Sequence, residues 1–319
     1  MNKRNRNIRM KRILITGAGG FLGSRLVDCF VKEEDYEIYA VTRKHNVASM
    51  KLANDRLHVL SPEEYMEKAY LLGNMDIWIN SAFPTGTSGE NRAAGLDYIC
   101  GLMKIVPSYV KIAIDISSQS IYDSQRKSPA DENSAICLND AYAVGKYMIE
   151  KMMDIYCKDI ICVHLRLASL IGVGMEQRFI NRFIRNICSG EAVRISGGGQ
   201  IYGFLDAKDA VEGIVLMTKC LVNPRENICA QLSGEKKILL NLGNKIFYSL
   251  GEICDKIVQI GIRRGYIPQI IVTHEDEKWY NSSLDSTKFC SIFPWQAKYL
   301  LEDTIGEIYE DVECRGKTI

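Results

Sequence analysis

The chain has 319 residues, of which 47% are hydrophobic and 25% charged, and these proportions are ordinary for a globular protein. Its net charge of +1 gives no reason to expect a nucleic acid or an anionic membrane as a partner. No apolar run approaches the roughly 18 residues that a membrane-spanning helix needs. A chain of this length suits one large α/β domain, or a large domain with a smaller one.

The cysteines and histidines indicate neither a disulfide framework nor a metal site. The eleven cysteines are scattered without a Cys-x-x-Cys pair, and the four histidines lack metal-ligand spacing. We therefore expect reduced, mostly buried thiols, no metal and a cytoplasmic location. Residues 1–10 are basic and lack the apolar segment of a secretion signal. We expect them to form a disordered tail, with the folded chain beginning at residue 11.

The first half of the chain alternates short apolar runs with helical patterns. Strands are predicted at 12–16, 36–43, 57–60, 75–82, 111–118 and 160–172. Helices are predicted at 21–33, 90–106 and 139–156. Strands that alternate with helices indicate right-handed βαβ crossovers, and hence a parallel sheet with helices on both faces.

Beyond residue 172 the pattern is looser. Helical or strand-like spacing recurs at 206–221, 248–262, 267–272 and 300–312. We predict that residues 11–172 form a dinucleotide-binding domain and that residues 173–319 form mainly a smaller substrate-binding lobe. Some segments of the second part are expected to return to the sheet of the first.

The segment ILITGAGGFLGSRL, residues 13–26, is typical of a phosphate-binding turn between a strand and a helix. Gly17 permits the tight turn, Gly20 lets backbone amides approach a pyrophosphate, and Gly23 allows close packing of helix and strand. The helix N-terminus adds a partial positive charge. The spacing Gly17-x-x-Gly20-x-x-Gly23 therefore predicts a dinucleotide site.

The choice of dinucleotide is made at the end of the second strand. NAD sites usually place an acidic residue there, whereas NADP sites offer a cation for the 2′-phosphate. This strand ends in Arg43 and Lys44, with no acid in place. The sequence favours NADP over NAD, and the alternative is that both cations are solvated surface residues, which are common after strands.

Tyr142 and Lys146 lie four residues apart, on one face of the predicted helix 139–156. A phenol is a poor acid–base catalyst at neutral pH, and a neighbouring ammonium stabilises the phenolate. The preceding strand ends in ISSQSIYD, which places a serine hydroxyl where ligands bind in open α/β sheets. Serine, tyrosine and lysine together predict a hydride-transfer site, in which Tyr142 moves the proton and the serine orients the oxygen.

These motifs resemble those of the extended short-chain dehydrogenase/reductases, in particular the nucleotide-sugar epimerase/dehydratase family. TGAGGFLG resembles its TGxxGxxG loop, YAVGK its YxxxK motif, and ISSQSIYD its SSxxVYG segment. The resemblance covers nearly all of residues 11–310. It implies a Rossmann-type, doubly wound parallel sheet with a smaller C-terminal substrate-binding lobe. It also implies a homodimer formed through helices 90–106 and 140–156.

The resemblance assigns roles to particular residues. The catalytic residues are Ser118, Tyr142 and Lys146. The cofactor-binding residues are Gly17, Gly20, Phe21, Leu22, Gly23, Arg43, Lys44, Asn80, Ala82, Tyr142, Lys146 and Ser169. The expected substrate contacts are Ser120, Asn181 and Tyr202.

Several positions depart from the family pattern. Gln119 and Ser120 stand where the 4,6-dehydratases have Asp-Glu, so dehydratase chemistry is disfavoured. Tyr202 replaces an arginine that contacts the nucleotide, and Ser169 replaces an asparagine. These departures put the usual contacts to a UDP-sugar in doubt, but they leave the hydride-transfer residues in place.

The resemblance implies an NAD(P)-dependent enzyme that acts at C4 of a nucleotide-linked hexose or deoxyhexose. An epimerase would retain its cofactor, whereas a 4-ketoreductase would use NADPH once. Two alternatives remain, namely an NADPH-dependent reductase of a non-sugar ketone and a dinucleotide-binding sensor without catalysis.

Overall fold

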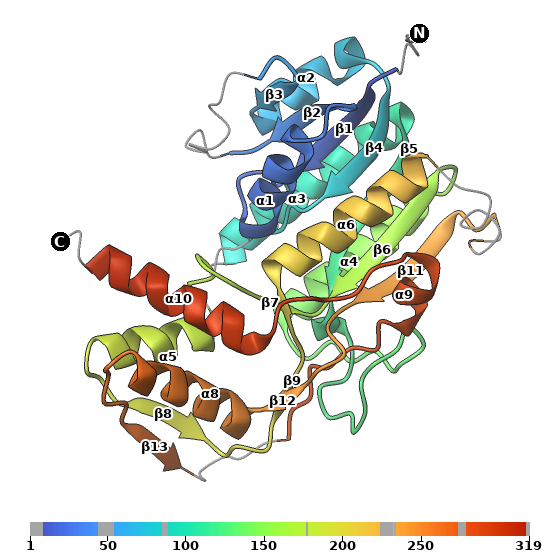
Figure 1. The fold of residues 1–319 in the computed structure, drawn as a ribbon. Coiled ribbons are helices and arrows are strands. Elements are labelled where there is room, and N and C mark those ends of the chain that lie inside the picture. The colour runs from blue at the N-terminus through green and yellow to red at the C-terminus, as the bar shows by residue number, and fades with distance from the viewer. Residues whose placement is uncertain are drawn as a thin grey trace, which may run out of the picture. The chain divides into compact units, whose positions relative to one another are not determined.

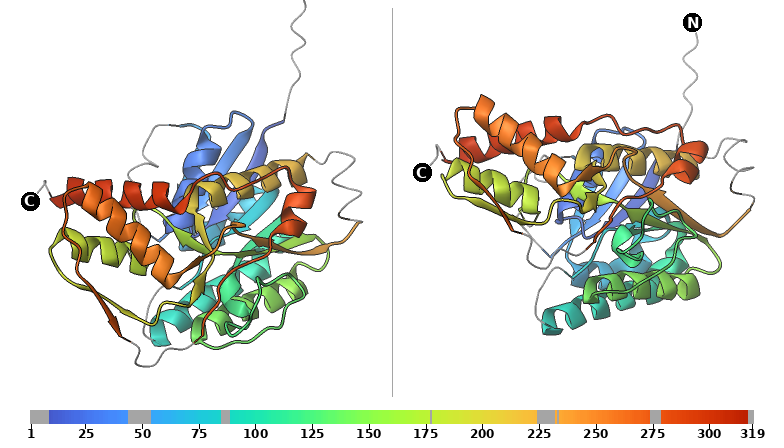
Figure 2. Two further views of the ribbon diagram at one scale, coloured as in Figure 1. Left: turned by 60° about the horizontal axis from the view of Figure 1, so that its bottom comes forward. Right: turned by 90° about the horizontal axis from the view of Figure 1, so that it is seen from below.

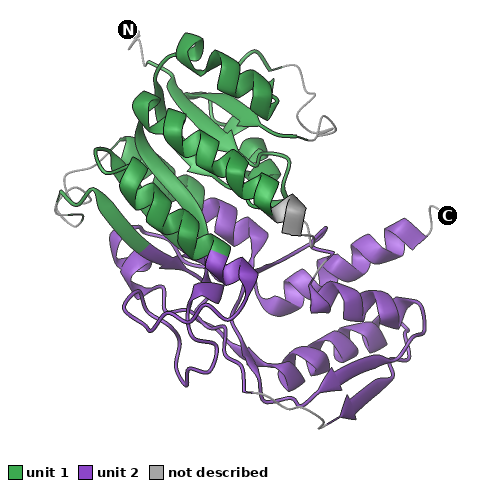
Figure 3. Ribbon diagram, turned by 180° about the vertical axis from the view of Figure 1, so that it is seen from behind, with its two compact units in different colours: residues 1–117, 145–165, 214–239 green, residues 118–144, 166–213, 240–319 purple. Residues whose placement is uncertain are grey.

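The computed structural model describes residues 9–43, 54–84, 89–176, 178–223, 232, 234–273 and 279–316. The chain forms two compact units, shown in different colours in Figure 3. The first unit comprises residues 1–117, 145–165 and 214–239, and the second comprises residues 118–144, 166–213 and 240–319. Each unit is thus assembled from three separate segments of the chain.

The main sheet has seven strands. They are β1 (Lys11–Thr16), β2 (Tyr36–Val41), β3 (Leu57–Leu60), β4 (Met75–Asn80), β5 (Val110–Ser118), β6 (Ile161–Leu167) and β11 (Lys237–Leu242). Their order is β11-β6-β5-β4-β1-β2-β3 (Figure 1). The pairs from β5 through β4, β1 and β2 to β3 all run parallel. The predicted α/β fold with a doubly wound sheet is confirmed.

Helices cover both faces of this sheet. The helices are α1 (Phe21–Val31), α2 (Pro62–Leu72), α3 (Gly89–Ile105), α4 (Ala141–Tyr156) and α6 (Ala207–Val222). On one face, Leu14, Trp78 and Ala113 are buried in a cluster with Ile99 of α3 and Ile149 of α4. Helices α3 and α4 run side by side there, whereas α1 and α6 lie on the opposite face (Figures 1 and 2). Short 3₁₀ helices at Val106–Tyr109 and Gln119–Ile121 flank β5.

The second unit has its own core. Its helices are α5 (Phe179–Cys188), α8 (Leu250–Arg263), α9 (Thr287–Ile292) and α10 (Leu301–Gly316). Apolar side chains of α5, α8 and α10 pack together in one buried cluster. Three short strand pairs complete the unit: β7 (Ser169–Ile171) with β10 (Phe204–Asp206), β8 (Val193–Ser196) with β13 (Ile270–Thr273), and β9 (Ile201–Tyr202) with β12 (Tyr248–Ser249).

No helix within the described ranges has both the length and the apolar character that crossing a bilayer requires.

Candidate functional site

The glycine loop is closely packed against the end of β4. Gly17 has a φ of +73°, and a Cβ there would lie 2.6 Å from the backbone nitrogen of Ala82. A Cβ on Gly23 would lie 2.2 Å from the carbonyl oxygen of Gly17. Gly20 is exposed, and its amide donates to the Gly17 carbonyl over 2.9 Å. Gly17 and Gly23 therefore allow backbones to approach closely, while Gly20 adds no side chain at an exposed position of the loop.

The start of α1 offers backbone amides to an anion. The helix follows Gly20, which provides no side-chain cap, and its described first turn contains no acidic residue. The first amides of a helix have no intrahelical acceptor, and the helix dipole favours negative charge there. Phe21 lies under the guanidinium of Arg25, 3.9 Å from the ring centre, and Leu22 is buried in the core. The loop and helix start thus fit the pyrophosphate of a dinucleotide.

Two cations, Arg43 and Lys44, are expected to select the cofactor, and the structure describes the first of them. Arg43 is exposed after the end of β2, and Lys44 lies outside the described residues.

The two predicted residues at the end of β4 are buried. The Nδ2 atom of Asn80 donates to Oδ1 of Asp115 over 3.1 Å, and Thr16 Oγ1 donates to Asn80 Oδ1 over 2.9 Å. Ala82 is 8% exposed and lies against Gly17. The amide of Asn80 is therefore already engaged by its neighbours in the sheet.

The predicted serine lies at the end of β5. Ser118 Oγ accepts a hydrogen bond of 3.2 Å from the backbone amide of Ser120 and donates one of 3.1 Å to the Ser120 hydroxyl. The Ser118 side chain is thus held by a turn that Gln119 and Ser120 form, and Ser120 lies in direct contact with it.

Helix α4 carries the predicted tyrosine and lysine. Asp140 accepts a hydrogen bond of 2.7 Å from the amide of Ala143 and so caps the helix start. Tyr142, in the first turn, is 39% exposed. Lys146, one turn later, is buried, and its Nζ donates to the carbonyl of Ile116 over 2.6 Å. The ammonium also lies 4.5 Å from the ring centre of Phe83, a favourable cation–π distance.

The expected substrate contacts lie in the second unit with Ser169. Asn181 Nδ2 donates to the Gly172 carbonyl over 3.3 Å, whereas its buried Oδ1 has no hydrogen-bond partner within the described ranges. The Tyr202 ring stacks on Phe204, and burial raises the pKa of its phenol to about 12. Ser169, on β7, is buried and pairs with Phe204. Asn181 thus presents an unpaired buried acceptor, and Tyr202 is part of an aromatic cluster.

The predicted residues divide between the two units. Ser118, Ser120, Tyr142, Ser169, Asn181 and Tyr202 belong to the second unit. Gly17, Gly20, Phe21, Leu22, Gly23, Arg43, Asn80, Ala82 and Lys146 belong to the first.

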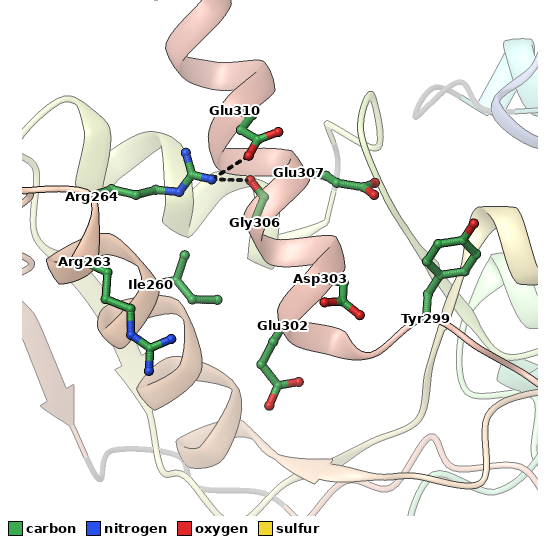
Figure 4. A pocket seen from close by; sticks show the side chains of 9 residues that line it. All are labelled: Ile260, Arg263, Arg264, Tyr299, Glu302, Asp303, Gly306, Glu307 and Glu310. Atoms are coloured by element: carbon green, nitrogen blue, oxygen red, sulfur yellow. Dashed lines mark hydrogen bonds and ion pairs between the residues drawn. The ribbon is translucent and has the colours of Figure 1, made fainter.

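An open groove of about 650 Å³ lies in the second unit between α8 and α10 (Figure 4). Its lining is charged, with Arg264 bonded to Glu310 at 2.9 Å and to Glu313 at 3.0 Å. None of the predicted site residues lines this groove. We do not assign the site to it, because Arg264 already pairs with Glu310, and Glu302 and Glu307 pair with Lys256 and Lys208.

The structure adds buried charged residues that the sequence motifs did not indicate. His164 on β6 lies 2.9 Å from Asp154 and 3.6 Å from Asp115. Burial disfavours its imidazolium, but the two carboxylates outweigh this effect and raise the pKa of His164 to about 9. Ser117 Oγ donates to Glu150 over 2.5 Å. The available signal was a polar residue inside each apolar run, Asp115 in β5 and His164 in β6, but neither run indicates that the two side chains meet.

A family model described as the NAD dependent epimerase/dehydratase family matches residues 13–228. UDP-glucuronic acid decarboxylase 6 from Arabidopsis thaliana is 21% identical to this chain, covering 95% of it and 89% of the relative. UDP-glucuronic acid decarboxylase 1 from Danio rerio is 26% identical, covering 93% of this chain and 71% of the relative.

Solved structures share the fold. A UDP-glucuronic acid 4-epimerase from Bacillus cereus, in complex with UDP-glucuronic acid and NAD, superposes with a TM-score of 0.79 at 19% identity, covering 95% of this chain and 99% of that one. A UDP-glucose 4-epimerase from Thermotoga maritima, with UDP-glucose, gives a TM-score of 0.76 at 21% identity, covering 96% and 99%.

These comparisons correct the expected cofactor. Arg43 and Lys44 favoured NADP, but the Bacillus cereus 4-epimerase was solved with NAD in several complexes. The preference for NADP is therefore wrong. Cations that follow a strand are also common as solvated surface residues, and the exposure of Arg43 agrees with that alternative.

Proposed function

The chain belongs to the NAD dependent epimerase/dehydratase family, and from this premise we propose that it is an NAD-dependent 4-epimerase of a nucleotide-linked hexose or deoxyhexose. The observation that carries the proposal is helix α4, on which Tyr142 and Lys146 lie one turn apart, with Lys146 bonded to the strand that ends in Ser118. The argument for a 4-ketoreductase rested on the preference for NADP, so it falls with that preference.

Each residue has a chemical role in this proposal. The loop from Gly17 to Gly23 and the start of α1 bind the pyrophosphate, and Lys146 bonds the nicotinamide ribose. Tyr142 exchanges a proton with the sugar O4, while Ser118 donates a hydrogen bond to the same oxygen. When bound, NAD supplies reversible hydride acceptance. Ser120 can replace the substrate as the partner of Ser118 when the site is empty, since the two hydroxyls already bond.

The proposed substrate contacts are Ser120, Asn181 and Tyr202. The unpaired Oδ1 of Asn181 is suited to a donor on the nucleotide sugar, because a buried acceptor without a partner is costly. We also propose that the second unit contributes most of the substrate contacts. None of the ten described cysteines forms a disulfide within the described residues, and three are buried, six half-buried and one exposed, which supports a cytoplasmic location.

The names of the curated relatives make decarboxylation of a nucleotide-linked uronic acid a second candidate. Both reactions are tested by incubating NAD-loaded protein with UDP-glucose, UDP-galactose and UDP-glucuronic acid, and separating the products by chromatography. We expect interconversion of 4-epimers. Release of carbon dioxide from UDP-glucuronic acid would instead support decarboxylation.

The catalytic assignment is tested with Tyr142→Phe, and Tyr147→Phe on the same helix serves as a matched control. Loss of the tyrosine proton donor lowers turnover by about 10²–10⁴-fold, whereas the control retains wild-type turnover. Turnover that survives Tyr142→Phe would overturn the role of Tyr142. NAD binding without turnover of any of these sugars would overturn the proposed substrate class.

A further inference from the structure

A row of polar side chains crosses the sheet of the first unit. Thr16 on β1 lies in register with Asn80 on β4, and Asn80 with Asp115 on β5. His164 on β6 continues the row, 3.6 Å from Asp115. All four residues are 1% exposed or less. The row therefore links β1, the strand that precedes the glycine loop, to β6, which lies on the other side of β5.

The direction of the hydrogen bonds along this row is determined at one end. Trp78 Nε1 donates to Thr16 Oγ1 over 3.1 Å, and an indole nitrogen can only donate. Thr16 then donates to Asn80 Oδ1, and Asn80 Nδ2 donates to Asp115 Oδ1. Asp115 Oδ1 is left as the acceptor at the end of the chain of hydrogen bonds.

His164 provides the positive charge that this buried carboxylate needs. Within the described ranges, neither Asp115 Oδ2 nor His164 Nδ1 has a hydrogen-bond partner, and 3.6 Å is too long for a hydrogen bond. A neutral imidazole would leave the carboxylate uncompensated, whereas an imidazolium attracts it at this distance. The geometry thus favours the charged ring.

The other charged and titratable groups around the ring lie on α4, in the turn that follows it, on β11 and on β6 itself. Asp154 of α4 contacts Nε2 at 2.9 Å and also binds Lys151 and Lys237. Cys162 Sγ lies 3.9 Å from Nε2. Glu150 of α4 acts on the ring through space, and the ring acts in the same way on Cys157. The carboxylates outweigh the burial of the ring, so the pKa of His164 is about 9.

The same contacts attach α4 to the sheet at three successive turns. Lys146 bonds the Ile116 carbonyl, Glu150 accepts from Ser117, and Asp154 contacts His164. These three residues of α4 are spaced at i, i+4 and i+8, so they lie on one stripe of the helix. His164 is the residue that joins this stripe to the row containing Asn80 and Thr16.

We propose that His164 is a positioning residue of the dinucleotide site: as a buried cation between Asp115 and Asp154, it holds the polar row and helix α4 in the arrangement that binds the dinucleotide. The inference rests on the proposed NAD site. Loss of the proton from His164 leaves Asp115 uncompensated and weakens NAD binding. By linkage, bound NAD makes His164 hold its proton more tightly.

The experiment measures this linkage without any sugar substrate. The titration midpoint of His164 is followed by ¹⁵N NMR of the imidazole, with and without saturating NAD, and the Kd for NAD is measured by calorimetry from pH 6.5 to 9.5. We expect NAD to raise the midpoint by about one pH unit, and NAD affinity to fall about tenfold as His164 deprotonates. His164→Gln should bind NAD about tenfold more weakly at pH 7, with little further decline at higher pH.

His58→Gln is the matched control, because His58 also contacts a carboxylate of the same unit at 2.9 Å, on Glu37, but is only partly buried. It should retain the wild-type affinity and pH profile. The NMR measurement needs no variant, so the test stands if His164→Gln fails to fold. An unchanged midpoint on NAD binding, or wild-type affinity in His164→Gln, would overturn the inference. Linked NAD binding without sugar turnover would overturn only the proposed function.

Discussion

The side chain of Lys146 donates a hydrogen bond of 2.6 Å to the main-chain carbonyl of Ile116. The contact ties the second turn of α4 to β5, two residues before Ser118. The ammonium is buried, and the Phe83 ring lies 4.5 Å away. Lys146 is therefore held in place by the protein itself, so its position does not depend on a bound ligand.

Replacing this lysine should separate its role from that of an ordinary cation. In Lys146→Met, we expect turnover to fall by about 10²–10⁴-fold, because the ammonium that supports the tyrosine is lost. NAD should also bind more weakly. Lys158→Met, at an exposed lysine just beyond α4, should leave both quantities unchanged. Steady-state kinetics and calorimetry with NAD provide the measurements, and unimpaired turnover in Lys146→Met would contradict its assignment.

The close packing of the glycine loop can be measured with a pair of alanine substitutions. Gly17 and Gly73 belong to the same unit and have nearly equal positive φ angles, +73° and +70°. A Cβ at Gly17 would lie 2.6 Å from the Ala82 nitrogen, whereas at Gly73 the nearest atom is 3.8 Å away, on the Arg12 side chain. Both variants incur a backbone cost, about 1–3 kcal/mol for a non-glycine residue held at positive φ, but only Gly17→Ala adds a clash.

We expect Gly17→Ala to lower the free energy of unfolding by at least about 1 kcal/mol more than Gly73→Ala, and to abolish NAD binding. Gly73→Ala should bind NAD normally. Urea unfolding and calorimetry measure the two effects. Equal stabilities together with equal NAD affinities would show that the approach of the loop to Ala82 is unimportant.

The buried histidine predicts a loss of stability at alkaline pH. Burial opposes its charge, but Asp115 and Asp154 raise the pKa of His164 to about 9 in the folded chain, above the value of about 6.5 in the unfolded chain. The folded state therefore holds the proton more tightly, and this stabilisation is complete below about pH 6.5 and lost as the pH rises through about 9. The free energy of unfolding should fall over this range by on the order of 3 kcal/mol.

Urea unfolding at a series of pH values and constant ionic strength tests this decline, which His164→Gln should lack. At acid pH the free energy of unfolding changes in the opposite direction, rising with pH. Burial opposes ionisation of Asp154, but His164 and Lys237 outweigh it and hold the pKa of this carboxyl well below its usual range. Its contribution is present above about pH 4 and lost below it, so Asp154→Asn should flatten the acid limb. A wild-type profile that is flat from pH 6.5 to 9 would contradict the assigned charge of His164.

The exposed stripe on α4 predicts the oligomeric state. Val144, Met148 and Ile155 lie on one side of the helix, and Met148 and Ile155 are 49% and 68% exposed. We propose that α3 and α4 form the interface of a homodimer. Met148→Glu should convert the dimer to a monomer in sedimentation experiments, whereas Ile262→Glu, at a 57% exposed position on α8, should not. A wild-type protein that is monomeric at all concentrations would contradict this proposal.

Local patterns predicted much of the first unit, because its buried strands appear as apolar runs and most of its helices as apolar residues at helical spacing. The predicted helix 139–156 matches α4, Ala141–Tyr156. Helix α2 was missed, although Ser61 and Glu64 form a capping box that begins it with Pro62 in its first turn. Ser61 followed three residues later by Glu64 was the signal that could have found it.

The sequence did not predict that one apolar run would pair with different strands along its length. The expected strand 160–172 is two strands, because Ala168 interrupts it, its amide bonding the carbonyl of Leu242. The part before Ala168 pairs in the main sheet, and the part after it pairs with β10. Similarly, Asp115 on β5 and His164 on β6 lie next to each other, and the local pattern of neither strand predicts this contact. The motif residues could be located from the sequence, but the contacts that hold Lys146 and Asn80 could not.

The interleaving of the two units limits how such a protein can change over generations. The chain passes from one unit to the other five times, so no single break yields two intact halves. A fragment that ends anywhere between residues 118 and 239 carries an incomplete copy of each unit. Exchange of one unit for a domain of another protein, which requires a single junction in the chain, is therefore closed to it. New substrate preferences would have to arise by point substitutions and by insertions within loops.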